Sequence, residues 1–208
     1  MNRRVSPRAA RKPPQQSRSR VTVSTILDAA VRVMDREGPD AATTTRIAEV
    51  AGVSVGTLYQ YFVDREAILD ALQDRELERT TELMQRVLSL RAPVVAHDIA
   101  RAVVEGLLAA YESAPGLHRV LTVEGLRAAP TARLQAFDMR VVGLVRGFLR
   151  TAPLPMRRTN VDAAAFVVFQ AVRASMLARL LEEPPGLDDR TLVDELTDML
   201  VRYLVEDA

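Results

Sequence analysis

Cysteine is absent from the 208 residues, which excludes disulfide bonds, cysteine-based zinc sites, iron–sulfur clusters and a thiol nucleophile. The chain has two histidines, His97 and His118, and no tryptophan. Two histidines are too few for a histidine-rich metal centre. We therefore expect no metal, no cofactor and no catalytic residues.

Long apolar runs are also missing from the printed sequence. By inspection, no run approaches the roughly 20 residues that a membrane-spanning helix needs. The charged N-terminal stretch is not followed by the apolar segment of a secretory signal. With 48% hydrophobic and 26% charged residues, the composition is that of a globular protein, and we expect it in the cytoplasm without membrane contact.

Alternation of apolar and polar residues, the mark of a half-buried strand, is not convincing anywhere, and Asn-Gly turns are missing. Glycine and proline instead divide the chain into segments with helical periodicity. We predict an all-α protein with about nine helices: an N-terminal three-helix unit followed by a larger helical domain. The predicted helices are 23–37, 44–51, 55–61, 65–90, 94–113, 117–127, 131–151, 160–183 and 188–206.

Positive charge is concentrated at the N-terminus. Residues 1–20 contain seven basic side chains and no acidic one, so the remaining 188 residues carry a net charge of −6. The segment is also rich in proline, glutamine and serine. Since it has almost nothing apolar to bury, we predict that residues 1–20 form a disordered basic arm.

The first three predicted helices have the layout of a DNA-binding unit. Thr22 is expected to cap the first helix, and Thr44 or Thr45 the second. Gly52 then provides the turn, and Ser54 caps a third helix that buries Leu58 and Phe62. Two short helices joined in this way form a helix-turn-helix, whose second helix enters the major groove.

The outward face of residues 55–61 has side chains suited to DNA. Thr57 and the tyrosine hydroxyls are able to bond phosphates, Gly56 permits close backbone approach, and Gln60 has the amide that recognises a base edge. The alternative, equally consistent with the periodicity, is that Tyr59 and Tyr61 are half-buried packing residues.

The run TTTRIAEVAGVSVGTLYQYF (43–62), followed by DREAIL (64–69), resembles the N-terminal domain of the TetR family of transcriptional regulators. The resemblance covers about residues 22–70. Val55 departs from the family pattern, which often has a polar or basic residue there, and favours contact with a thymine methyl group. The DNA-binding residues implied are Thr44, Thr45, Arg46, Ser54, Val55, Gly56, Thr57, Tyr59, Gln60, Tyr61 and Arg65.

After the arm 1–20, which the composition predicts, the same resemblance implies two domains: a DNA-binding domain 21–66 and an effector-binding and dimerisation domain 67–208. It implies a repressor released from a palindromic operator when a small apolar or amphipathic ligand binds. The helix beginning at Arg65 would be the mechanical link between the two domains. Candidate pocket residues are Leu83, Val104, Leu107, Leu108, Tyr111, Leu121, Phe137, Phe166, Phe169, Gln170, Arg173 and Met176.

The predicted helix 160–183 is apolar nearly all round, which indicates burial by its own chain on one side and by a partner on the other. By resemblance, it and the last helix pair with their copies in a homodimer; the alternative is a purely intramolecular bundle. The predicted interface residues are Val161, Ala164, Val168, Val172, Ser175, Leu192, Leu196, Met199 and Tyr203.

Two other functions compete with this one. One is a DNA-binding regulator of the same fold without a small-molecule switch. The other is an α-helical enzyme, but the sequence has no glycine-rich phosphate loop, no HExxH and no Gly-x-Ser-x-Gly. We therefore expect a regulator and not an enzyme.

Overall fold

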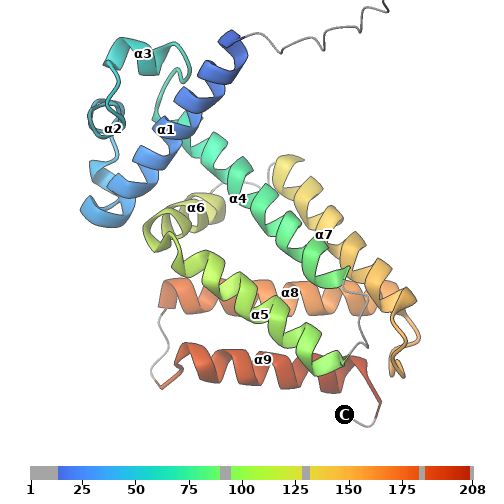
Figure 1. The fold of residues 1–208 in the computed structure, drawn as a ribbon. Coiled ribbons are helices and arrows are strands. Elements are labelled where there is room, and N and C mark those ends of the chain that lie inside the picture. The colour runs from blue at the N-terminus through green and yellow to red at the C-terminus, as the bar shows by residue number, and fades with distance from the viewer. Residues whose placement is uncertain (1–13, 90–94, 128–131, 183–185, 207–208) are drawn as a thin grey trace, which may run out of the picture. The chain divides into compact units, whose positions relative to one another are not determined.

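The computed structural model describes residues 14–89, 95–127, 132–182 and 186–206. Within these ranges the chain forms nine α-helices, one short 3-10 helix and no strand; the single bridge joins Met156 to Val205 (Figure 1). The predicted all-α class is confirmed. The elements are α1 (Pro14–Glu37), η1 (Pro39–Ala41), α2 (Thr44–Ala51), α3 (Val55–Tyr59), α4 (Arg65–Leu88), α5 (Ala96–Glu112), α6 (Pro115–Arg127), α7 (Ala132–Thr151), α8 (Val161–Glu182) and α9 (Asp189–Leu204).

The chain divides into two compact units, Met1–Ile68 and Leu69–Ala208, so the boundary falls within the first two turns of α4. In the first unit α1 packs against α2 and η1, and α2 packs against α3. Ile26, Ile47 and Leu58 are completely buried between these helices. Their burial is what fixes the orientation of the two short helices.

Helix α1 begins earlier than the sequence indicated. Its first residue is Pro14, a residue type that is well tolerated at the start of a helix because the first amide has no helical partner. The prediction of a disordered arm is therefore wrong for residues 14–20, while residues 1–13 lie outside the described ranges. Thr22 is not a cap but lies within the helix, where its hydroxyl donates a hydrogen bond to the Arg18 carbonyl at 3.0 Å.

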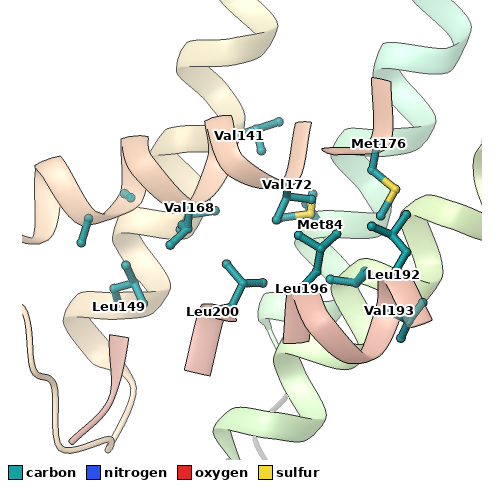
Figure 2. Packing of buried hydrophobic residues seen from close by; sticks show 14 residues of the cluster. Met84, Val141, Leu149, Val168, Val172, Met176, Leu192, Val193, Leu196 and Leu200 are labelled. Atoms are coloured by element: carbon teal, nitrogen blue, oxygen red, sulfur yellow. The ribbon is translucent and has the colours of Figure 1, made fainter. Parts of the chain in front are cut away.

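The second unit is a bundle in which α5 packs against α9 and α7 against α8 (Figure 1). Its core joins side chains from five helices, and Figure 2 shows Met84 and Val172 beside Leu196 of α9, with Val141 of α7 above Val172. The buried residues contributed by α8 and α9 include Ala164, Val168, Val172, Met176, Leu192, Leu196 and Leu200.

This core corrects the predicted dimer interface. Ala164, Val168, Val172, Leu192 and Leu196 are all buried within one chain, so they are unable to meet a partner. Val161 and Tyr203 also pack against this core. Ser175 is partly buried, and its hydroxyl donates to the Ala171 carbonyl; only Met199 of the predicted set is exposed. The sequence pattern had placed the wrong face of α8 outward.

The outward face of α8 is apolar nonetheless. Ala163, Phe166, Val167 and Ala174 are exposed and recur at helical spacing. Contrary to the reading of the sequence, α8 is long and apolar enough by composition to cross a membrane, although core helices of soluble proteins meet the same test. Within one chain, 28% of its most apolar window is buried.

Candidate nucleic-acid interface and ligand cavity

The turn between α2 and α3 is built by local signals. Thr43, not Thr44 or Thr45 as predicted, caps α2 by accepting a hydrogen bond from the Arg46 amide at 3.2 Å. Gly52 ends α2 with a φ of 69°, a left-handed conformation that favours glycine. Ser54 caps α3 as predicted, accepting from the Thr57 amide at 3.0 Å. These three residues set the geometry of the helix-turn-helix.

The face of α3 that the sequence assigned to DNA is accessible. Val55, Gly56 and Gln60 are exposed, and the Tyr59 side chain is 50% exposed, while Leu58 and Phe62 are buried on the opposite side. Tyr61 is partly buried. The hydroxyls of Tyr59 and Thr44 lie 3.1 Å apart, which ties the end of α3 to the start of α2. Thr44, Thr45 and the α3 side chains therefore form one polar surface.

Two hydroxyls on this surface are already bonded to each other. Ser54 Oγ and Thr57 Oγ1 lie 2.8 Å apart. A hydroxyl has one donor and two acceptor lone pairs, so one of the two retains its donor for an outside acceptor. One hydroxyl of the cap is thus able to donate a hydrogen bond to a phosphate oxygen while the first turn of α3 stays intact.

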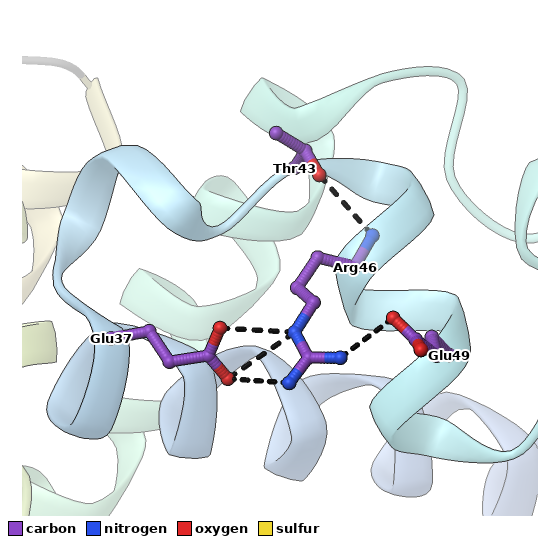
Figure 3. Close-up of polar contacts among 4 residues, drawn as sticks. All are labelled: Glu37, Thr43, Arg46 and Glu49. Atoms are coloured by element: carbon purple, nitrogen blue, oxygen red, sulfur yellow. Dashed lines mark hydrogen bonds and ion pairs between the residues drawn. The ribbon is translucent and has the colours of Figure 1, made fainter.

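Arg46 is held by carboxylates of its own unit (Figure 3). Its guanidinium donates to Glu37 of α1 through Nε and Nη2, at 3.0 and 2.9 Å, and to Glu49 through Nη1 at 2.6 Å. Hydrogen bonding to Arg46 lowers the pKa of the Glu37 carboxyl, and the two acids raise the pKa of Arg46. In this arrangement Arg46 joins α2 to α1, which competes with the phosphate or base contact predicted for it.

Arg65, the predicted phosphate contact, also has partners within the unit. Its Nε donates to the Ala42 carbonyl at 3.1 Å and its Nη2 to the Pro39 carbonyl at 3.2 Å. The side chain thereby fixes the segment between α1 and α2 from the start of α4. Residues 21–66 carry four arginines against seven acids, a net charge of −3, and two of those arginines are engaged in this way.

Replacing Glu37 with Gln tests the Glu37–Arg46 bridge. Because the folded pKa of Glu37 lies below its ordinary value, the bridge stabilises the fold above the unfolded pKa, and this contribution disappears as the pH falls through the folded pKa. Thermal unfolding followed by circular dichroism should show a lower Tm for Glu37→Gln at pH 7, and the difference from wild type should narrow as the pH is lowered through the acid range. Asp40→Asn, at an exposed position nearby, is the control, and equal Tm values at pH 7 would contradict the prediction.

The second unit contains a partly open cavity of about 280 Å³, lined by residues of α4, α5, α6, α7, α8 and α9. Seven predicted pocket residues line it: Leu107, Tyr111, Leu121, Phe137, Phe169, Arg173 and Met176. Five do not: Leu83, Val104, Leu108, Phe166 and Gln170.

Each of these five has another place. Leu83 packs against the backbone of α5 so closely that a Cβ on Gly106 would lie 2.9 Å from its Cδ1. Val104 is wholly buried in the core, and Leu108 lines a smaller neighbouring cavity. Phe166 is 53% exposed and Gln170 partly buried, on the outward side of α8. Helical periodicity identified apolar positions but not the direction in which each side chain points.

The sequence analysis missed the polar wall of the cavity on α4, formed by Gln73, Glu76 and Thr80. A signal was present, because Glu76 follows Leu69 and Leu72 at positions i+7 and i+4 on the buried stripe of the helix. His118 also lines the cavity and is 7% exposed. Among the described residues, no group of three His, Asp or Glu side chains could hold a metal ion.

A tight helix pair with an accessible second helix, built on a buried three-helix core, defines a helix-turn-helix protein. Residues 26–72 match the family model for bacterial regulatory proteins of the tetR family, and residues 96–204 match the model for the tetracyclin repressor-like C-terminal domain. The chain belongs to the TetR family.

An uncharacterized helix-turn-helix-type transcriptional regulator of Mycobacterium tuberculosis is 36% identical over 77 residues, which cover 36% of this chain and 38% of that protein. The complex of SmeT with triclosan has a TM-score of 0.71 at 21% identity, covering 90% of this chain and 93% of SmeT, the repressor of a Stenotrophomonas maltophilia efflux pump. FadR of Bacillus subtilis, in complex with stearoyl-CoA, has a TM-score of 0.66 at 21% identity and covers 86% of this chain and 98% of FadR. These structural likenesses show the shared fold.

Proposed function

We propose that the protein is a homodimeric repressor that binds a palindromic operator through α2 and α3 and is released by a small apolar or amphipathic ligand. The observation that carries this proposal is the continuity of α4. The helix begins with Arg65, which fixes the segment before α2, and its later turns supply Glu76 and Met84 to the cavity wall. A ligand that displaces α4 would therefore act on the DNA-binding unit through one continuous helix.

The DNA contact is supported by Gly56. A Cβ at this position would meet only Ser54 Oγ, at an ordinary 3.9 Å, among the described atoms. Nothing within the chain therefore requires a glycine there, although glycine is unfavourable inside a helix. Close approach of a DNA backbone to this exposed position would explain the residue. We propose that Gln60 and Val55 contact bases, and that Thr57, Tyr59 and Tyr61 contact phosphates.

The ligand is supported by the character of the cavity, whose wall is mainly apolar with a few convergent polar groups. Structural neighbours hold triclosan in SmeT and stearoyl-CoA in FadR, both of which combine a large apolar part with a polar one. We infer that this chain takes a ligand of the same general kind. Since it would act on chromosomal DNA, we place the protein in the cytoplasm and assign it no catalytic activity.

The dimer is supported by the exposed stripe of α8, formed by Ala163, Phe166, Val167 and Ala174. Phe166 and Val167 are 53% and 43% exposed, and both stand on the most apolar helix of the chain. Large apolar side chains exposed together in this way are typical of an interaction site. A second copy of the same stripe, related by a two-fold axis, would cover it. The dimer would then present two DNA-binding units to one operator.

Mobility-shift titration with DNA from upstream of the protein's own gene tests the proposal. Binding at a palindromic site, with half-sites about 34–36 Å apart, is expected for a dimer. Random DNA of equal length at the same ionic strength is the control, because non-specific affinity depends on salt. Equal affinity for both DNAs would contradict specific recognition. Specific binding that no amphipathic ligand releases would support a regulator without a small-molecule switch.

Gly56→Ala should change stability and DNA affinity in opposite directions. Alanine replaces glycine inside a helix with open space around it, so the unfolding free energy should rise by about 0.5–1 kcal/mol. The added methyl group should hinder the DNA backbone and weaken operator binding. Denaturant unfolding and mobility shifts on the same preparation measure the two effects. Unchanged affinity in the stabilised variant would remove Gly56 from the DNA contact.

A further inference from the structure

The cavity of the second unit has most of its polar α4 side chains at one end and only apolar ones at the other. Along α4, the lining side chains are Gln73, Glu76, Leu77 and Thr80, followed by Met84 and Leu88. The distance from Glu76 to Leu88 is about 18 Å at roughly 1.5 Å per residue. The cavity therefore suits an elongated molecule with its polar group near Glu76. The remaining polar lining residues, Tyr111, His118, Thr122 and Arg173, come from α5, α6 and α8.

Glu76 is a buried carboxylate whose charge is already compensated. It is 8% exposed, and its Oε1 bonds Arg79 Nη1 at 2.9 Å and lies 3.6 Å from Arg75 Nε. Its Oε2 lies 3.8 Å from His118 Nε2, and both residues line the cavity. This separation exceeds a direct hydrogen bond. One small polar group of a ligand, placed beside both atoms, would be within reach of each.

The other charged group on the wall is compensated as well. Arg173 Nη1 donates to Asp138 of α7 at 2.8 Å. Because Glu76 already lies beside two arginines and Arg173 beside Asp138, a cationic head group would find no carboxylate on the wall without a cation, and an anionic head group placed beside Glu76 would meet its carboxylate. Burying an unmatched charge is strongly unfavourable. An uncharged head group that both donates and accepts hydrogen bonds carries no such cost.

We infer that the ligand is an uncharged, elongated amphiphile whose hydroxyl group donates a hydrogen bond to Glu76 Oε2 and lies beside His118. This inference rests on the proposed function, since it specifies the ligand of the same cavity. Tyr111 packs edge-on against His118, with ring centroids 4.8 Å apart, and burial raises the pKa of its phenol, so the Tyr111 hydroxyl stays protonated. It is a further neutral donor at this end. The alkyl or other linear body extends toward Leu88, Leu149 and Leu204.

Calorimetric titration of the full chain with 1-decanol below its solubility limit, and with decanoate and decylammonium below their micellar concentrations, tests the inference. The three probes share one alkyl chain and differ in the charge of the head group. We expect 1-decanol to bind at least tenfold more tightly than either ion. Tighter binding of decanoate or of decylammonium would overturn the inference, as would equal affinity for all three.

Glu76→Gln should reverse part of this order. The amide keeps the shape of the side chain but removes the negative charge that lies beside Arg75 and Arg79, so the polar end becomes more positive. The ratio of decanoate to decanol affinity should rise at least tenfold. Glu78→Gln, at an exposed position on the same helix, is the matched control and should leave the ratio unchanged. An unchanged ratio in a folded Glu76→Gln protein would overturn the assignment of the head group to Glu76.

Arg173→Met gives the mirror test if Glu76→Gln does not fold. It leaves Asp138 without its cation, so decylammonium should gain at least tenfold relative to decanol. The wild-type ranking decides the inference even if neither variant folds. Because calorimetry is carried out without DNA, failure of decanol to release the operator from saturated protein would contradict the proposed repressor mechanism and not the ligand class.

Discussion

Changing Phe166 and Val167 together to glutamate is expected to produce a folded monomer that binds the operator about 10²–10⁴-fold more weakly. Both side chains are exposed on the outward stripe of α8, so charge there is hydrated in the monomer and the core is untouched. In a dimer the same glutamates would face their copies and repel. A monomer presents one reading head, so the second half-site no longer contributes through effective concentration. Sedimentation gives the mass, circular dichroism the fold and mobility shifts the affinity.

Two comparison variants make this result specific. Met139→Glu places a charge on an apolar residue of α7 that is 70% exposed, and it should change neither mass nor affinity. Val172→Glu places the charge in the core of one chain and should unfold the second unit. A dimeric Phe166→Glu/Val167→Glu protein would contradict the proposed stripe. If Val172→Glu instead gave a folded monomer, the result would support the face of α8 that the sequence pattern predicted as the dimer interface.

The elements that could be predicted from the sequence are those with local causes. The bounds of α2 agree with the predicted 44–51, and Gly52 and Ser54 act as expected because a left-handed turn and a hydroxyl cap are properties of one or two residues. The start of α1 could not be found in this way. A proline and several polar residues lowered the apparent helical tendency of residues 14–20, yet proline is acceptable in the first turn.

The orientation of α8 was not predictable for a different reason. Apolar residues lie on nearly all its sides, so periodicity gives no preferred direction, and the packing of α7 decides which face is inside. That packing buries Val168 and Val172 and leaves Phe166 outside, which contradicts one predicted pocket residue and three predicted interface residues of α8. For such a helix, tertiary contacts and not the local sequence pattern determine which face is buried.

The polar end of the cavity could not be predicted from the sequence pattern either. Glu76 and His118 are 42 positions apart in the sequence and lie on different helices. Either residue alone is most simply taken as solvent-exposed. Only the folded second unit brings them within 3.8 Å of each other and buries both. The stripe from Leu69 through Glu76 was the one available hint.

Removing residues 1–13 is expected to weaken binding to specific and random DNA alike and to reduce its salt dependence. Without this segment, the DNA-binding unit has little positive charge to offer to DNA. Residues 21–66 have a net charge of −3, and Arg46 and Arg65 are held by internal partners. Phosphate neutralisation supplies most of the non-specific affinity of DNA-binding proteins. We propose that the N-terminal segment provides it, along the phosphates or in the adjacent minor groove. The basic residues removed are Arg3, Arg4, Arg8, Arg11 and Lys12.

The truncation begins the chain at Pro14 and therefore keeps all of α1, so the loss is not a loss of the fold. Each phosphate contact removed should lower the slope of log K against log salt by about 0.9, or up to ~4.5 per protomer if all five bases contact DNA. Replacing the four arginines by lysine keeps the charge and should preserve the slope, whereas replacing all five bases by glutamine should match the truncation. If the truncated protein keeps both its affinity and its slope at low ionic strength, the segment has no part in DNA binding, and the positive charge must come from Arg18 and Arg20 on the first turns of α1.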